Sequence, residues 1–234
     1  MPKVLSPVSG RPMIDHLFDR YRTTVSRWVL VLHPSFEEQV RDHVDGVAGS
    51  LDVAYASQPQ PTGMLDAILL AQEEAAATNP DRIWITWCDQ IGVHPETVAA
   101  LTRMSAEHPT AHVILPTVTQ PEPYIHLVRD ASGRISAVKQ RREGEVMPQI
   151  GESDMGLFSL SRDAYFAELP RYGREAGEAS ATRERNFLPF FPWLTHHGHA
   201  VLTFPATNPL EAVGVNTPDD RRRLEAYLRE LEDL

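Results

Sequence analysis

The stretch from Arg82 to Gln90 constrains the fold most strongly, because an apolar run ends there abruptly in the carboxylate of Asp89. A buried parallel strand that delivers an acid to the carboxyl edge of a sheet has this pattern. Pro95 and Glu96 then open a helix, so the unit is predicted as strand, acid, loop and helix. Ligands bind at that edge in open α/β sheets, where an aspartate can hold a divalent cation against a phosphate. An aspartate that serves only as a turn or cap residue at a strand end is an equally open interpretation.

The regions on either side of this unit repeat the alternation of strand and helix. Further strands are predicted at Trp28–Leu32, Leu51–Ala56 and Ala111–Thr117. Helices are predicted at Met13–Tyr21, from Ser35 as the cap to Val44, at Met64–Ala77 and after Pro95. This order predicts an α/β fold with a Rossmann-like, mostly parallel sheet, flanked by helices on both faces and joined by right-handed crossovers.

After about Gln120 the sequence becomes richer in β-structure. A hairpin is predicted around the turn Asp130–Gly133, and the segment Arg171–Arg183, rich in Gly, Ala, Arg and Glu, is predicted as a mobile loop. The other predicted elements are a strand at Met155–Leu160, an aromatic helix at Phe187–His197, a strand at Ala200–Phe204 and a last helix from Pro218 to Leu234. No linker separates two units, so residues 1–234 are predicted to form a single domain.

Composition excludes several classes of function. A net charge of -10 and a pI near 5.4 argue against nucleic acid as a partner, because a phosphate-binding surface needs an excess of Lys and Arg. Cys88 is the only cysteine, and the apolar run before it predicts a buried side chain in a reducing cytoplasm. No apolar run approaches the roughly 18 residues that span a bilayer, so no membrane partner is expected.

Several short motifs occur in the order and spacing of the sugar-1-phosphate nucleotidyltransferases. They are Pro2–Leu5 with Gly10–Met13, Pro61–Gly63, Trp87–Asp89 and Gly214–Thr217. The chain resembles this family along nearly its whole length, most closely the uridylyltransferase domain that makes UDP-N-acetylglucosamine, and more broadly the MobA-like NTP transferases. The resemblance implies a nucleotide-binding part at 1–119 and, at 120–234, a sugar-phosphate part with the C-terminal helix.

The activity implied by this resemblance is Mg²⁺-dependent nucleotidyl transfer from a nucleoside triphosphate to a sugar 1-phosphate, with release of pyrophosphate. Asp89 and Asn216 resemble the two protein ligands of the Mg²⁺, and Lys3 resembles the catalytic lysine that meets the phosphates. Thr62 and Gly63 resemble the turn whose backbone approaches the base. Oxygen ligands from only two side chains suit Mg²⁺, which keeps waters and takes further ligands from phosphates.

Each of these residues also has a simpler interpretation. A lysine near a terminus, such as Lys3, is commonly solvated, and Asn216 can be a turn residue before the last helix. Gln58 or Gln60 can read the edge of the base, but glutamines in a proline-rich loop are more often surface polar groups. The histidines at 196–199 lack acidic or cysteine partners at zinc-ligand spacing, and a helix end that favours positive charge accounts for them.

The acceptor side departs from the acetylglucosamine-specific pattern. Those enzymes carry Tyr-Gly-Arg, a glutamate in the following strand, and Glu-x-Asn-x-Gly. This chain has instead Tyr124-Ile125-His126, Gln140 and Glu152-Ser153-Asp154-Met155-Gly156. Tyr124, Gln140, Asp154 and Gly156 are thus the predicted sugar-phosphate residues, while the identity of the sugar stays open.

A second departure concerns the start of the chain. The family opens with a strand and a glycine-rich loop directly before the Pro-Lys-Val-Leu element, and this sequence has neither. That strand lies in the middle of the family's sheet, so we expect two strands with unpaired edges and a slot between them. We also expect Met1 to be an internal methionine, with roughly twenty residues upstream. Unpaired edges would favour association of copies into a homo-oligomer.

Two hypotheses follow for the function. The first is an active nucleotidyltransferase; the alternative is a catalytically inactive or truncated relative that binds a nucleotide or sugar phosphate. Asp89, Asn216 and Lys3 together favour the first. The metal assignment requires that oxygens of Asp89 and Asn216 lie within reach of one cation.

Overall fold

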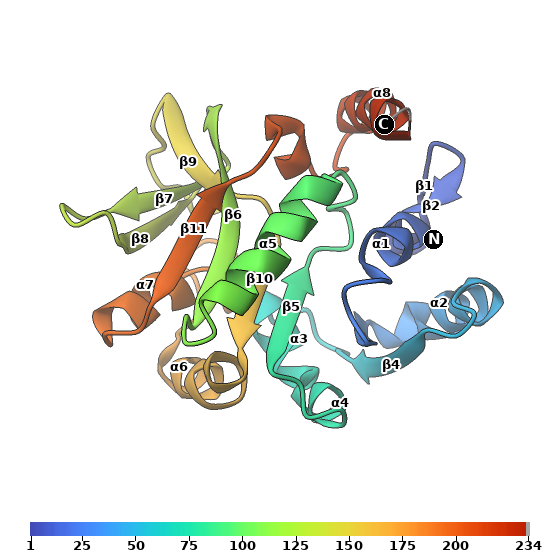
Figure 1. Ribbon diagram of the computed structural model, residues 1–234, viewed down its shortest axis with the longest axis horizontal. Coiled ribbons are helices and arrows are strands. Elements are labelled where there is room, and N and C mark those ends of the chain that lie inside the picture. Colours follow the sequence, from blue (N-terminus) through green and yellow to red (C-terminus); the bar gives the residue numbers. More distant parts are fainter. Residues whose placement is uncertain (233–234) are drawn as a thin grey trace.

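The central feature of the fold is a mixed five-stranded sheet with helices on both faces, seen in a computed structural model that describes residues 1–232 (Figure 1). The strands are β5 (Arg82–Thr86), β6 (Val113–Pro121), β9 (Ile150–Asp154), β10 (Leu157–Ser161) and β11 (Val201–Pro205). Their order is β11-β6-β10-β5, and β9 pairs with the distal part of β6. β11 and β6 are parallel, whereas β10 lies antiparallel between β5 and β6. The predicted α/β class is therefore confirmed, and two strands of this sheet, β9 and β10, run antiparallel to β6.

Each face of this sheet has its own hydrophobic core. On β10, Phe158 and Leu160 face one cluster while Leu157 faces the other, as the two-residue period of a strand requires. The first face is covered by α3 (Met64–Leu70), α6 (Leu169–Glu175) and α7 (Phe190–His196). The second is covered by α1 (Met13–Tyr21), α5 (Pro95–Glu107) and α8 (Pro218–Glu232). In the described residues no helix is long and apolar enough to cross a membrane.

A separate pair of parallel strands carries the N-terminal part of the chain. These are β3 (Arg27–Leu32) and β4 (Asp52–Ser57), which pack with α1 and α2 (Pro34–Val47) around a third core cluster. In Figure 1, α1, α2 and β4 lie together on the right of β5. Within residues 1–232, β3 pairs only with β4 and β5 pairs only with β10.

A groove of about 1050 Å³ lies between the facing edges of β3 and β5. Trp28–Leu32 and Ile83–Asp89 line its walls, and Pro2, Lys3 and Val4 lie at one end. Every residue of both strands is only half-buried, although their apolar side chains are typical of a sheet interior. The expected slot between two unpaired edges is thus present.

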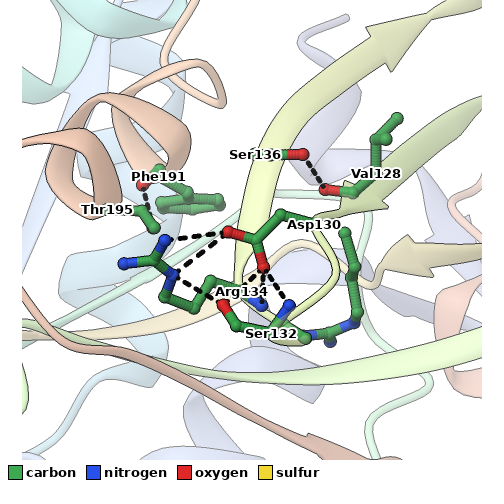
Figure 2. A network of polar contacts seen from close by, with 9 residues as sticks. Val128, Asp130, Ser132, Arg134, Ser136, Phe191 and Thr195 are labelled. Carbon is green, nitrogen blue, oxygen red and sulfur yellow. Dashed lines mark hydrogen bonds and ion pairs between the residues drawn. The ribbon is translucent and has the colours of Figure 1, made fainter.

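The predicted hairpin is also present, as β7 (Ile125–Arg129) and β8 (Ile135–Gln140). Its turn is closed by the Asp130 carboxylate, which accepts hydrogen bonds from the backbone N–H groups of Ser132 and Arg134 at 2.9 and 3.0 Å (Figure 2). Hydrogen bonds to the Ser132 hydroxyl and to the Arg134 side chain add to these, and together they lower the pKa of Asp130 to about 2.

Several local predictions were wrong. The N-cap of α2 is His33 rather than Ser35, because the His33 ring nitrogen accepts the backbone N–H of Ser35 and Pro34 occupies the first helical turn. The predicted helix at 64–77 divides at Ala71 into α3 and α4 (Gln72–Ala76). The aromatic helix begins at Phe190, three residues later than predicted. The last helix was predicted to reach Leu234, which lies outside the described residues.

The predicted mobile loop at 171–183 is partly helical, because α6 extends to Glu175. Tyr172 is buried in the first core cluster, and its hydroxyl donates to the backbone carbonyl of Asn186 at 3.0 Å. The rest of the segment is held by the Glu143 carboxylate, which accepts the backbone N–H groups of Ala181 and Thr182. Tertiary packing therefore outweighs the helix-weakening effect of Gly173.

The open groove predicts that an added strand will stabilise the protein. A synthetic peptide of about six β-branched apolar residues should pair with the edges of β3 and β5 and raise Tm by a few degrees, because a ligand that binds only the folded state stabilises it. A thermal melt with increasing peptide measures this shift. A peptide of equal hydrophobicity with alternate prolines is the control, because it cannot donate the ladder hydrogen bonds. Equal shifts with both peptides would contradict pairing of the edges.

Candidate active site

Three polar side chains from distant parts of the sequence meet beyond the carboxyl end of β5. Lys3 lies in a short turn of 3₁₀-helix, Asp89 follows β5, and Asn216 precedes α8. The Lys3 ammonium lies 2.5 Å from Asp89 Oδ2 and 2.8 Å from Asn216 Oδ1. Both oxygens therefore face one point and are within reach of a single cation. This is the geometry that the metal assignment requires.

The simpler interpretations of these residues account for only part of what is observed. The Lys3 side chain is 44% exposed, but its ammonium is held by two partners rather than free in solvent. Asn216 does serve the turn before α8, because its backbone N–H donates to Asp220 at 3.2 Å. Its side-chain oxygen is nevertheless directed at Lys3. The backbone of Asn216 therefore serves the turn, while its side chain contacts Lys3 and the Gly214 carbonyl.

The chemistry of this oxygen pair fits Mg²⁺ better than a transition metal. One carboxylate and one amide oxygen are hard ligands, and they leave most of an octahedral shell to water and phosphate oxygens. Among residues 1–232 no group of three His, Cys, Asp or Glu side chains could hold a metal ion. Among the histidines at 196–199, His197 Nδ1 contacts the Trp193 carbonyl at 2.8 Å near the end of α7.

A cavity of about 550 Å³ opens beside Asp89 and Asn216. It is lined by every predicted site residue except Lys3, Thr62 and the alternative Gln60, which is exposed; the lining residues are Gln58, Gly63, Asp89, Tyr124, Gln140, Asp154, Gly156 and Asn216. The strands β8 and β9 and the turn after β9 supply its far wall. The fold therefore brings the predicted nucleotide-side and sugar-phosphate-side residues together around one cavity.

The Pro-Thr-Gly turn lies at the edge of this cavity. Gly63 lines it, whereas Thr62 is exposed and its carbonyl accepts the backbone N–H of Arg185 at 2.8 Å. Gly63 has a φ of 120°, and a Cβ there would lie 2.5 Å from the Arg185 carbonyl oxygen. Gln58 donates to the Gly63 carbonyl at 3.1 Å. Much of the polar capacity of this turn is thus used to fix its own shape.

Asp154 is the most perturbed acid in the cavity wall. It is 8% exposed, and burial raises the pKa of its carboxyl group to about 6, although the backbone N–H of Gly156 donates to Oδ2 at 2.9 Å and opposes the shift. The other oxygen, Oδ1, has no hydrogen-bond partner. Near neutral pH this acid changes protonation state easily.

Three further residues around the site were not among the predicted site residues. Arg142 lies just beyond the end of β8 and lines the cavity, where its guanidinium pairs with Glu184 at 2.9 Å. Gly214 belongs to the Gly214–Thr217 motif but had no predicted role of its own; it packs against Asp89, because a Cβ at this position would lie 2.9 Å from Asp89 Oδ2. Gln90 is 4% exposed beside Asp89. For Arg142 and Gln90, only closeness in sequence to Gln140 and Asp89 could have indicated a role.

The prediction of a buried Cys88 was wrong. The residue is exposed, because it faces the groove left by the free edge of β5. The walls of the groove still surround the thiol, and this desolvation, with the nearby charge of Asp89, raises its pKa to about 11. Cys88 is therefore a protonated thiol near neutral pH and a poor nucleophile.

Comparison with known proteins shows the family to which the chain belongs. The MobA-like NTP transferase domain pattern matches residues 1–154 of the chain, which include Lys3, Asp89 and the cavity residues up to Asp154. The chain belongs to the MobA-like NTP transferase domain family.

Several proteins that are similar in sequence to this chain carry the name "Bifunctional protein GlmU". The protein from Cupriavidus necator is 34% identical over 161 residues, which cover 67% of this chain and 33% of the relative. The protein from Chromohalobacter salexigens is 26% identical over 231 residues, which cover 98% of this chain and 48% of the relative. The Stenotrophomonas maltophilia protein is 24% identical over 228 residues, with 96% and 47% coverage. The chain thus spans a third to a half of the length of these relatives.

The close contact at Gly214 predicts a cost for any side chain there. Gly214→Ala should lower the free energy of unfolding by about 1–3 kcal/mol, because the new methyl group displaces the Asp89 carboxylate or its own segment. Urea unfolding followed by circular dichroism measures the change. Gly46→Ala is the matched control, since nothing lies within 4 Å of its Cβ and it lies within α2. A Gly214 variant as stable as this control would show that Asp89 is not tightly held.

The raised pKa of Asp154 predicts a pH dependence of stability. The folded state holds a proton that the unfolded state releases near pH 4, so this group stabilises the fold below that pH and the contribution is lost as pH rises through about 6. Between pH 4 and 7, the free energy of unfolding of Asp154→Asn should therefore rise by up to about 3 kcal/mol relative to that of the parent. Chemical unfolding of both proteins across this range tests the sign; parallel stability curves would contradict it.

Proposed function

We propose that this protein transfers a nucleotidyl group from a nucleoside triphosphate to a sugar 1-phosphate, giving a nucleotide sugar and pyrophosphate. The observation that supports this most directly is the meeting of Lys3, Asp89 and Asn216 at the rim of the cavity lined by Tyr124, Gln140 and Asp154. Lys3, Asp89 and Asn216 suit a phosphate and its cation. Tyr124, Gln140 and Asp154 offer polar groups for a sugar. Membership of the NTP transferase family supports the same reaction class.

The reaction needs no covalent intermediate with the protein. An oxygen of the sugar phosphate attacks the α-phosphorus, a new P–O bond forms, and the bond to the β-phosphate oxygen breaks so that pyrophosphate leaves with its electron pair. Lys3 supplies a positive charge beside the triphosphate, while Asp89 and Asn216 would hold Mg²⁺. When bound, Mg²⁺ neutralises phosphate charge and orients the phosphate oxygens for in-line displacement. The cavity walls hold the two substrates in position.

The acceptor wall favours a substrate that donates hydrogen bonds. Asp154 offers only carboxylate oxygens when ionised, and Gln140 is 4% exposed at the end of β8. Tyr124 is 55% exposed, so its ring is free to cover a bound sugar. Sugar hydroxyl groups match these partners.

A second candidate function is binding without turnover. The groove between β3 and β5 opens directly beside Lys3, Asp89 and Asn216, so one side of the phosphate site has no protein wall in the described residues. A site open on that side would hold a nucleotide or sugar phosphate while exposing the triphosphate to water. This observation favours the inactive alternative.

The two candidates differ in pyrophosphate release. We expect release with Mg²⁺ and at least one pair of ribonucleoside triphosphate and sugar 1-phosphate, and at least a hundredfold loss in Asp89→Asn, because charge stabilisation by the metal is worth several kcal/mol. A coupled pyrophosphate assay over a panel of pairs measures this. Asp42→Asn, an exposed acid of α2, is the matched control. Calorimetric binding of a triphosphate without any turnover would support the inactive candidate instead.

A further inference from the structure

The two proposed metal ligands reach their common point from loops rather than from rigid elements. Asp89 lies in a turn closed by the hydrogen bond from the backbone N–H of Gln90 to the carbonyl of Trp87, at 3.1 Å. Asn216 lies in the segment between η4 (Pro209–Ala212) and α8. A cation site requires a fixed separation between its ligands, so other contacts must join these two loops.

The joining contacts converge on Glu211, a carboxylate with no exposed surface. Its Oε2 accepts the backbone N–H of His94 at 2.8 Å, and its Oε1 accepts the backbone N–H of Asn208 at 2.7 Å. His94 belongs to the loop that carries Asp89, and Asn208 begins the segment that carries Asn216. One side chain therefore ties the two loops together.

Gln90 adds a second tie from the other direction. Its side-chain amide donates to the backbone carbonyl of Glu211, and Gln90 is the residue next to Asp89. Glu211 itself stands three residues before Gly214, the glycine that packs against Asp89. The hydrogen bonds of Gln90 and Glu211 thus join the loop that carries Asp89 to the segment that carries Asn216.

Glu211 acts through hydrogen bonds to backbone groups. Each of its two oxygens accepts one backbone N–H, one from each loop. Both of its oxygens must act as acceptors. A glutamine in its place would direct an NH₂ group at one of the two N–H donors and break that link.

We propose that Glu211, with Gln90, is a positioning residue that sets the separation of Asp89 and Asn216 and thereby the affinity for a divalent cation bound with phosphate. This role rests on the proposed function, because it acts through the cation site of that function. Under this proposal Glu211 contributes to substrate binding as well as to the packing of η4.

The test compares Glu211→Gln and Gln90→Met with the parent protein. Calorimetric titration with the Mn²⁺–pyrophosphate complex should show at least a tenfold weaker Kd for Glu211→Gln, and a smaller weakening for Gln90→Met, which loses one hydrogen bond. Amide hydrogen exchange should become faster in 89–94 and 208–216 in both variants. Gln90→Met also keeps the test valid if Glu211→Gln fails to fold, which a thermal melt reveals.

Asp130→Asn is the control, because Asp130 also binds two backbone N–H groups but closes the distant β7–β8 turn (Figure 2). Its Kd for the complex should equal that of the parent. Binding that is lost in Asp89→Asn but unchanged in Glu211→Gln and Gln90→Met would overturn the positioning role alone. Absence of binding by the parent protein would overturn the cation assignment of the proposed function, and the positioning role with it.

Discussion

The site depends on one interaction, the contact of the Lys3 ammonium with Asp89 and Asn216. It joins the first residues of the chain, the end of β5 and the start of α8, which no other single contact does among the described residues. A carboxylate facing an amide oxygen has no attraction for it, so a positive charge between them is what makes the arrangement favourable. The surrounding elements serve to bring these three side chains to the same place.

Much of this arrangement could be predicted from the sequence. The run ending in Asp89 indicated the strand and the acid beyond its carboxyl end. The prediction of a buried parallel strand was wrong in two respects, because β5 pairs only with the antiparallel β10 among the described residues and is half-buried. α1 was predicted with its observed bounds, since Ile14, Leu17 and Phe18 have clear helical spacing. The slot beside β5 was predicted from the departure from the family pattern, because strand order in a sheet fixes which neighbours have unpaired edges.

The remaining features depend on contacts that local patterns do not contain. β9 was missed because Ile150–Asp154 holds a glycine and two acids, and it is a strand only through its pairing with β6. The antiparallel direction of β10 is set by its neighbours β5 and β6, which lie far from it in sequence. Arg142 and Glu211 have no local sequence pattern that distinguishes them, since a single arginine or glutamate is most often a surface residue. Their importance comes from burial and hydrogen bonding, which are properties of the folded chain.

The separation of Lys3 and Asn216 also has a consequence for the order of folding. The two side chains that meet at the proposed cation site are 213 positions apart, so the site joins segments that are distant along the chain. Contacts of such high sequence separation form late, after the intervening chain has paid its loop-closure entropy. The parallel pair of β3 and β4, whose strands are close in sequence, can therefore form before the proposed cation site does. Binding of a phosphate ligand would then report the last stage of folding rather than the formation of the sheet.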